Sequence, residues 1–244
     1  MSNAPAKTIL LYDIPGNCSP DKAYSPSVWK TRLVLNYKKL LHKTEWVEYP
    51  DIAPLAQKIG ASPCGQKPDG GPLYAVPILY DPVTESCYTD SFDIALHLEA
   101  AYTNAPSVFP NRTKALIRAW DEIWMEKAGR PMYQLILSSV HAQLSQASQT
   151  YFRETREAKF GTLEAPPDTW EKLEHGLSSI DAYMAQSRFV MGEQMTYADM
   201  VMAGWLICVR RVLGMESDGW RRIEQWHNGR WKRFVDEFAH LEYV

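Results

Sequence analysis

The sequence predicts an α/β domain followed by an all-helical domain. In the first part of the 244-residue chain, short apolar runs of strand type alternate with amphipathic helical segments. A polar connection that contains proline, TNAPSVFPNR, follows at residues 103–112. Beyond it, apolar residues recur with the period of an α-helix. We therefore expect domains at residues 1–102 and 113–244, joined by a linker at 103–112.

The first domain should run strand, helix, strand, loop, strand pair and helix. Strands are indicated by short apolar runs between turn formers, and the first helix by apolar residues on one face. The loop is too rich in Pro and Gly for regular structure. These segments are 8–13 (TILLYD), the helix of Trp29, Leu33, Tyr37 and Leu40, 44–49 (TEWVEY), the loop 60–72, 75–90 with a turn at Asp81-Pro82, and a helix from Ser91.

The second domain contains one strong helix start. Thr196 and Asp199 form a capping box, and Met195 and Met200 are placed as a hydrophobic staple, which is a role in folding. Interruptions are expected at Gly129, at Pro166-Pro167 and at Gly192, and the expected helices lie near 113–128, 131–146, 168–186, 197–213 and 222–239.

Composition and charge exclude several classes of partner. The chain has 45% hydrophobic and 23% charged residues, as in an ordinary globular protein. Its net charge of −3 supplies no basic field for nucleic acid or acidic lipid. The N-terminal MSNAPAKT lacks the apolar segment of a signal peptide, and the longest apolar run, Met200–Val209, is too short to span a bilayer. We expect a cytoplasmic protein.

The cysteines indicate a reducing compartment and no metal site. They stand at positions 18, 64, 87 and 208, without CxxC spacing and without clustering with the six His. We therefore expect free thiols and no bound metal.

The stretch YSPSVWKTRL (24–33) places Ser25 and Pro26 at the start of a helix. Serine is a good cap and proline suits the first helical position, so a purely structural role is one interpretation. The helix also follows the first strand, so its N-terminus lies near the sheet edge where α/β folds bind ligands. An anion there would meet the helix dipole and a hydroxyl donor. Ser19 is a weaker candidate, because Pro26 would break a helix begun there.

Two further positions allow a structural and a functional interpretation. Pro77 lies inside an apparent strand, which indicates an edge strand, a bulge, or a cis proline that leaves the Val76 backbone free for a ligand. Asp90 and Ser91 open the helix of TDSFDI and can cap it. The same pair can also grip an amino-acid head group, with the serine and helix amides on its carboxylate and Asp90 on its ammonium.

Taken together, these motifs resemble those of cytosolic glutathione transferases over nearly the whole chain. SPSVWKTRL resembles the family's Ser/Cys-Pro-x-x-x-Lys/Arg-x-Arg-Leu helix start, AVPIL its cis-proline strand, TDSFDI its Glu/Asp-Ser motif and GEQMTYADMVMAGWL its capping box. YDIPG, WKTRLVLNYKKL, WVEYPDI and KPDGGPLYAVPIL look most like the fungal class related to bacterial β-etherases. The resemblance implies a thioredoxin-like N-terminal domain and an all-helical C-terminal domain.

The resemblance also implies roles for single residues. Ser25 would hold the sulfur of the co-substrate glutathione as a thiolate, in addition to capping its helix. Val76 would pair with the cysteinyl part, with its geometry set by Pro77, and Asp90 and Ser91 would hold the γ-glutamyl end. The long loop at 60–72 departs from many classes, so Gln66 and Lys67 are only candidates for the glycine end. Cys18 is interpreted as an incidental loop thiol.

An aromatic pocket is expected beside the sulfur, for phenolics or small aromatic electrophiles such as aryl ethers. The candidates are Tyr24, Trp29, Trp120 and Trp124; for either of the last two taken singly, which lie four residues apart, a place in the core is the better interpretation. Three functions fit: a serine-type detoxifying transferase for xenobiotics, a protein that sequesters aromatic ligands, and a regulatory scaffold. Intact Ser25, Asp90 and Ser91 argue against the scaffold. A homodimer is the expected assembly.

Overall fold

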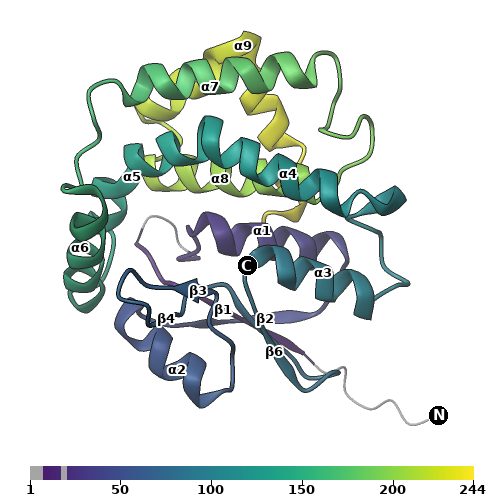
Figure 1. The fold of residues 1–244 in the computed structure, drawn as a ribbon. Helices are drawn as coiled ribbons and strands as arrows, with labels where there is room; N and C mark the ends of the chain where they lie inside the picture. The colour runs from purple at the N-terminus through teal and green to yellow at the C-terminus, as the bar shows by residue number, and fades with distance from the viewer. Residues whose placement is uncertain (1–7, 18–20) are drawn as a thin grey trace.

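A small mixed sheet lies under layers of helices in the computed structural model, which describes residues 8–17 and 21–244 (Figure 1). The sheet order is β2-β1-β5-β6; β1 is parallel to β2, and the other neighbours are antiparallel. Helices α1 and α3 cover the face toward the helical domain, and α2 covers the other face. The bounds are β1 Ile9–Asp13, α1 Pro26–Tyr37, β2 His42–Trp46, α2 Ile52–Lys58, β5 Ile78–Asp81, β6 Ser86–Thr89 and α3 Ser91–Ala101.

The register of the sheet brings three chain segments to one edge. Tyr12, near the end of β1, pairs with Ile78 at the start of β5, and Ile78 pairs in turn with Thr89 at the end of β6. The loop toward α1, the residues before β5 and the start of α3 therefore all leave the sheet at the same side. The α/β prediction for this domain is confirmed, including the strand pair within 75–90.

Two expectations for the first domain need correction. The second strand ends at Trp46, and a 3-10 turn at Tyr49–Asp51 follows, because Pro50 cannot donate to a strand ladder. The loop 60–72 is not wholly irregular, since β3 (Gly65–Gln66) pairs antiparallel with β4 (Pro72–Leu73). Both β3 and β4 are exposed, so the hairpin adds little to the core.

The second domain is all-helical, as predicted. Helices α4, α5 and α8 lie over α1 and α3, while α7 and α9 form the outermost layer and α6 stands at one side (Figure 1). The bounds are α4 Lys114–Trp124, a π-helical segment Met125–Gly129, α5 Arg130–Ala142, α6 Gln146–Phe160, α7 Thr169–Met184, α8 Tyr197–Leu213 and α9 Asp218–Asp236, with short 3-10 turns at Pro110–Arg112 and Ala239–Leu241.

The helices differ from the prediction in three respects. The interruption at Gly129 is wrong, because a π turn carries α4 directly into α5. Pro131 cannot donate to the Lys127 carbonyl, and the wider turn just before it accommodates that loss. Helix α6 was not predicted, because its sequence is largely polar and buries little. Helix α9 starts earlier than expected, since Ser217 accepts from the Trp220 amide at 3.1 Å and caps it.

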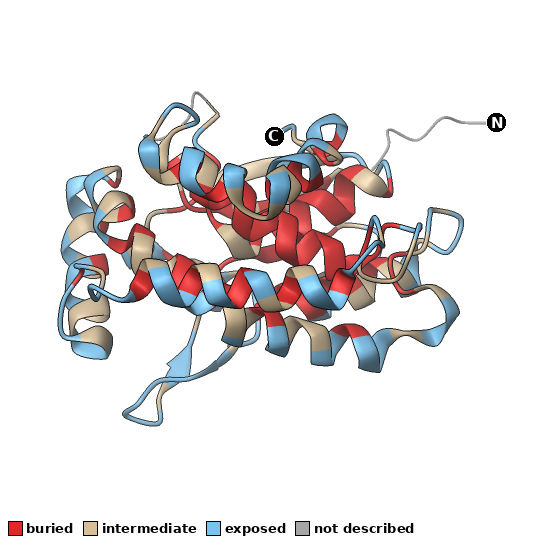
Figure 2. Cartoon of the chain, turned by 90° about the horizontal axis from the view of Figure 1, so that it is seen from above, coloured by how far each residue is buried: buried red, intermediate tan, exposed pale blue. Residues whose placement is uncertain are grey.

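Helix α8 forms the centre of the molecule and is buried along nearly its whole length (Figure 2). The predicted capping box is confirmed at its start. The Asp199 carboxylate accepts from the Thr196 amide and hydroxyl, each at 2.8 Å, and from the Val190 amide at 2.7 Å. Burial raises the pKa of Asp199 to about 6.

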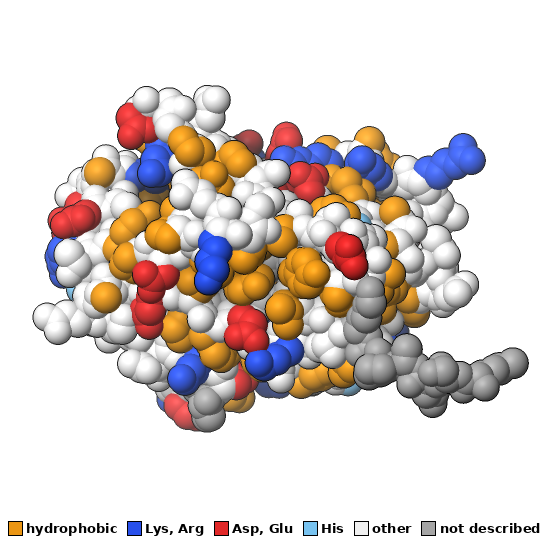
Figure 3. Space-filling view, turned by 90° about the horizontal axis from the view of Figure 1, so that it is seen from below, with side chains coloured by type: hydrophobic (Ala, Val, Ile, Leu, Met, Phe, Trp, Pro, Cys, Tyr) orange, Lys and Arg blue, Asp and Glu red, His pale blue; other side chains and the backbone are white. Residues whose placement is uncertain are grey.

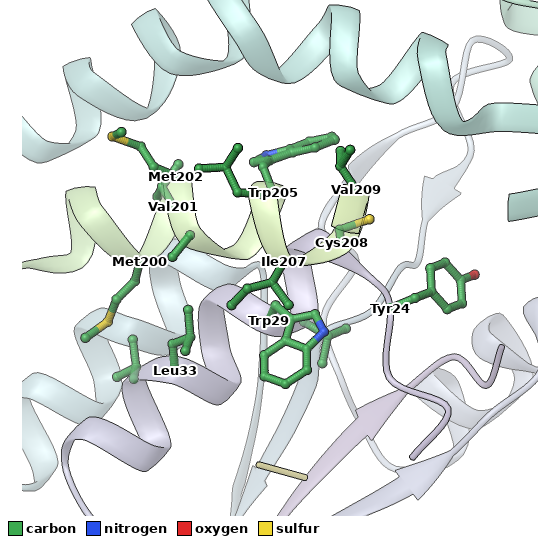
Figure 4. Packing of buried hydrophobic residues seen from close by; sticks show 14 of the residues in the cluster. Tyr24, Trp29, Leu33, Met200, Val201, Met202, Trp205, Ile207, Cys208 and Val209 are labelled. Carbon is green, nitrogen blue, oxygen red and sulfur yellow. The ribbon is translucent and has the colours of Figure 1, made fainter. Parts of the chain in front are cut away.

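The domains meet where α1 crosses α8. A Cβ atom on Gly204 would lie 2.9 Å from the Pro26 carbonyl oxygen and 3.1 Å from the Lys30 nitrogen. Only glycine at this position therefore allows so close an approach to the α1 backbone. Trp29 and Leu33 of α1 pack beneath α8 in the same contact (Figure 4).

Positive and negative side chains alternate over the surface of the α/β domain that faces away from the helices. Seen from below, orange hydrophobic atoms are interspersed with Lys, Arg, Asp and Glu side chains (Figure 3). The described residues on this face thus build no field of a single sign. Among the helices of residues 8–17 and 21–244, none combines the length and apolarity that a membrane span needs.

Gly204→Ala should lower the free energy of unfolding by about 1–3 kcal/mol, because the added methyl group meets helix backbone that cannot turn aside. The matched control is Gly129→Ala, where the Cβ comes closest to the flexible Met125 thioether, at 2.6 Å, and reaches the Trp205 ring only at an ordinary contact distance of 3.5 Å. That control should be neutral or stabilising through helix propensity. Urea denaturation measures both. Equal stability of Gly204→Ala and the wild type would contradict the close contact.

Asp199→Asn should change how stability depends on pH. The folded-state pKa of about 6 exceeds the ordinary 3.8, so the folded protein binds the extra proton between these values. The stabilisation of the folded protein by protonated Asp199 is therefore complete below pH 3.8. It is lost as pH rises through the folded-state pKa of about 6. The stability of the wild type relative to the variant should fall on the order of 3 kcal/mol across this window. Denaturant unfolding at several pH values gives this difference, and a constant difference would refute the assignment.

Candidate functional site

Ser25 stands at the start of α1, at the sheet edge described above. Its side chain makes no capping hydrogen bond, so the expectation that its hydroxyl caps the helix is wrong. Pro26 restricts the preceding residue to an extended conformation, and Ser25 has φ −55° and ψ 121°. The residue is 8% exposed. A hydroxyl that the helix does not use remains available to a ligand.

The Val76–Pro77 peptide is cis, which decides between the alternatives left open by the sequence. An edge strand is excluded because β5 lies inside the sheet, between β1 and β6. Pro77 also precedes the first paired residue, Ile78, so the proline removes no hydrogen bond from the ladder. Val76 thus precedes the ladder, at the same sheet edge as the loop toward α1.

Asp90 caps α3 in an unusual backbone conformation. Its Oδ1 accepts from the Phe92 amide at 2.9 Å and from the Asp93 amide at 3.4 Å. Its φ is 67°, a value that costs a non-glycine residue of the order of 1–3 kcal/mol. Both cap bonds use one oxygen, so Oδ2 has no donor among the described residues. Ser91 follows as the first residue of α3 and is buried.

An open cavity of about 630 Å³ adjoins Asp90, between the starts of α3 and α4. Asp90 and Asp93 form an acidic side, and Arg112, Lys114 and Arg118 form a basic side. Ser25, Val76, Pro77 and Ser91 do not line it. The remaining lining residues are Pro63, Cys64, Thr89, Phe92, Leu96 and Ala115.

Buried charges hold α1 in place beneath the site. Arg32 donates to Asp13 of β1 at 2.8 Å and to the Thr44 hydroxyl at 2.7 Å. Burial raises the pKa of Asp13 to about 6 and lowers the pKa of Arg32. Lys30 forms an ion pair of 3.1 Å with Asp121 of α4, which ties α1 to the helical domain.

The four expected pocket aromatics lie in different surroundings. Trp29 and Trp124 are 0% exposed and belong to the core, so neither offers a surface to a ligand in this conformation. Trp29 also donates to the Ala23 carbonyl, and the Arg32 and Arg211 guanidinium groups lie 5.4 Å and 4.6 Å from its ring centre. Trp120 is half-buried on α4. Tyr24 is buried, and its hydroxyl points away from the contact between α1 and α8 (Figure 4).

Sequence reasoning missed the residues that surround Tyr24. We call Tyr24, Tyr49, Tyr133, Phe152 and Arg156 the Tyr24 cluster. The hydroxyls of Tyr24 and Tyr49 lie 3.3 Å apart, and the Arg156 guanidinium donates to the Tyr133 hydroxyl. Burial raises the pKa of Tyr49 to about 12 and that of Tyr24 well above its ordinary value, so both phenols are neutral at pH 7. No local signal joins these residues, since Arg156 lies on the unpredicted helix α6.

None of the described cysteines forms a disulfide, and burial keeps their reactivity low. Cys208 is buried, and burial raises the pKa of the Cys64 and Cys87 thiols. Cys18 and Ser19 lie outside the described residues. Within residues 8–17 and 21–244, no three His, Cys, Asp or Glu side chains come together as a metal site would require.

Family models match both halves of the chain. The model of the glutathione S-transferase N-terminal domain matches residues 24–101, and that of the C-terminal domain matches residues 115–241. The chain belongs to the glutathione S-transferase family. The resemblance stated from the sequence is thereby confirmed, and the protein is a glutathione transferase.

Solved structures of fungal members agree with this transferase along nearly its whole length. CsGST63524 of Ceriporiopsis subvermispora, crystallised in complex with glutathione, is 40% identical, with a TM-score of 0.93 and coverage of 97% of this chain and 98% of that one. GSTFuA3 of Phanerochaete chrysosporium is 39% identical, with a TM-score of 0.92 and the same coverage.

A curated relative is more distant. The glutathione S-transferase-like protein UstS of Aspergillus flavus is 28% identical over 242 residues, which cover 90% of this chain and 84% of that protein.

Proposed function

We propose that this transferase binds glutathione at the sheet edge and uses the Ser25 hydroxyl to stabilise its thiolate. The observation that carries the proposal is that Ser25 stands at a helix N-terminus with a hydroxyl that makes no capping bond. A helix N-terminus favours an anion, and a hydroxyl can donate to a thiolate. The crystallised complexes of the Ceriporiopsis relatives with glutathione support the choice of co-substrate.

The Ser25 hydroxyl and the N-terminus of α1 can together supply the free energy needed to lower the pKa of the glutathione thiol. A thiol with a pKa near 8.5 needs about 2.7 kcal/mol of preference for the thiolate to lower its pKa by about two units. One hydrogen bond to a charged group contributes about 1.5–3 kcal/mol, and a helix terminus about 0.3–1 kcal/mol. A serine cannot form a mixed disulfide, so the proposed chemistry is transfer to an electrophile rather than thiol–disulfide exchange.

The γ-glutamyl end is assigned to Asp90 and Ser91 in this proposal. The unused Oδ2 of Asp90 would accept from the ammonium, while Ser91 and the first α3 amides would hold the carboxylate. The Val76 backbone would pair with the cysteinyl part, with Pro77 setting its direction. No metal is assigned a part in the reaction.

The electrophile is proposed to be aromatic and to bind near Tyr24, which directly precedes Ser25. Five aromatic rings gather there, from the N-terminal domain (Tyr24 and Tyr49), α5 (Tyr133) and α6 (Tyr151 and Phe152). Mostly apolar walls with a few polar anchors are typical of such pockets. Aryl-ether compounds are the substrate class that the β-etherase resemblance suggests. Sequestration of phenolics without turnover is the competing function.

Assembly and location are part of the proposal. Leu116 and Ile123 are exposed on α4, with Trp120 half-buried between them on the same face. We assign this face to the contact of a homodimer. We also keep the division into domains at 1–102 and 113–244, the linker at 103–112, and a cytoplasmic location.

Ser25→Ala should lower turnover with a neutral aryl halide by about tenfold to a hundredfold and raise the kinetic pKa of bound glutathione, because the thiolate loses its donor. Glutathione affinity should change little, since the other contacts remain. Ser25→Cys should introduce disulfide exchange, because a thiol at a helix N-terminus has a lowered pKa. Steady-state kinetics across pH test both variants. If turnover and the pH profile survive in Ser25→Ala, the proposed role of Ser25 is wrong.

Asp90→Asn should raise the glutathione dissociation constant at least about tenfold. Asparagine keeps an oxygen for the α3 cap and tolerates positive φ, so the change removes mainly the charge. Asp93→Asn is the matched control, because Asp93 lies on the same helical turn and makes no cap. Calorimetry with glutathione should show a smaller effect for the control, and unchanged affinity of Asp90→Asn would exclude the assignment.

A further inference from the structure

Arg156 differs from the other partly or fully buried arginines of the described chain. Those four each have a carboxylate partner: Arg32 pairs with Asp13, Arg210 and Arg211 with Glu242, and Arg230 with Asp181. Arg156 forms no such pair within residues 8–17 and 21–244, and the remaining positions of the chain contain no Asp or Glu.

The contacts of Arg156 leave much of its hydrogen-bonding capacity unused. Nε donates to the Tyr133 hydroxyl, and one terminal nitrogen donates to the Thr155 hydroxyl at 3.0 Å. A guanidinium has five N–H donors, so further donors have no partner among the described residues. The other terminal nitrogen, Nη2, has no partner among the described residues and is not one of the fully buried unpartnered atoms, so it reaches solvent.

Aromatic rings hold this guanidinium in a fixed position. It lies 4.8 Å from the ring centre of Phe152, 5.8 Å from that of Tyr49 and 6.0 Å from that of Tyr133. Helix α6 is fixed against the N-terminal domain nearby, because the Tyr49 amide donates to the Ser148 hydroxyl at 3.0 Å. An arginine that is held rigidly loses less conformational entropy when it binds a second partner.

The location connects this charge to the proposed electrophile pocket. The Tyr49 ring is next to Arg156, and its hydroxyl reaches Tyr24, which directly precedes Ser25. All three phenols of the cluster are neutral at pH 7, so the guanidinium carries the only positive charge of the cluster with no negative charge to oppose it. Tyr24 and Phe152 are buried, so a flat ligand here would meet the half-buried rings of Tyr49 and Tyr133 and a guanidinium fork at one end.

We propose that Arg156 is a specificity-determining residue that selects aromatic compounds bearing a carboxylate. A carboxylate accepts two parallel N–H bonds from a guanidinium, a geometry that a neutral amide or ester cannot match. The inference rests on the proposed aromatic site near Ser25 and specifies its substrate class: an aromatic acid rather than a neutral aromatic compound.

The test compares hydrocinnamate with hydrocinnamamide, which have nearly the same shape and differ in charge. Calorimetric titration of the wild type at pH 7, with glutathione present, should show at least about tenfold tighter binding of the acid. Arg156→Met, which keeps much of the side-chain volume, should abolish this preference. Arg156→Lys should retain part of it. The matched control is Arg153→Met, because Arg153 lies on the same helix, is exposed and pairs with Glu157 at 2.9 Å. That variant should keep the wild-type preference.

Chemical modification of the wild type gives a second result that does not depend on variants folding. Phenylglyoxal labels accessible arginines, and mass spectrometry locates the label. Hydrocinnamate should protect Arg156 and leave Arg153 labelled, whereas hydrocinnamamide should protect neither. Equal binding of the two ligands by the wild type, a preference that persists in Arg156→Met, or absence of protection would each overturn the inference. A separate titration with glutathione alone distinguishes failure of the Arg156 inference from failure of the proposed function. If glutathione does not bind, the proposed function itself is wrong.

Discussion

The close contact between α1 and α8 is the constraint on which the rest of the molecule depends. Helix α1 lies between the sheet and the most buried helix, so its position is determined from both sides. Gly204 removes the side chain that would separate the two backbones. The buried pairs Arg32–Asp13 and Lys30–Asp121 then fix α1 against β1 and α4. Breaking either pair would leave a buried charge without a partner, which is strongly destabilising. The N-terminus of α1, with Ser25, is therefore held rigidly by contacts that take no part in chemistry.

Features encoded within a few residues could be predicted from the sequence. The capping box of Thr196 and Asp199 and the cap by Asp90 each depend on positions at most three apart, so side-chain chemistry and spacing suffice to find them. The two-domain order followed from periodicity and from the proline-containing linker. The convergence of the candidate site residues at one sheet edge followed from strand order and from the resemblance to a known family, and the register of β1, β5 and β6 supplies its geometric basis.

Features set by tertiary packing could not be predicted in the same way. In the sequence, Trp29 is as consistent with a pocket as with a core; only the packed structure shows that it is fully buried and contacted by two arginines. Gly129 has the signature of a helix break, yet the π turn before Pro131 lets the helix continue. Helix α6 buries little of its own surface, so its periodicity is weak; it owes its position to contacts with residues about a hundred positions earlier in the chain. Since α6 carries Arg156, missing it meant missing the charge in the Tyr24 cluster.

The sequence left two roles open for Ser25, and the structure separates them in chemical terms. Capping uses a lone pair of the hydroxyl oxygen, whereas holding a thiolate uses its proton, so one serine could do both. Here the helix begins without a side-chain cap. The amides of its first turn are thus not satisfied by Ser25, and they add to the field that an anion would meet at this end. Pro26 restricts the backbone of Ser25 and suits the first helical position, where a missing amide costs no helix bond. In the proposed function, the Ser25 hydroxyl and the remaining first-turn amides would therefore act on one anion from the same helix end.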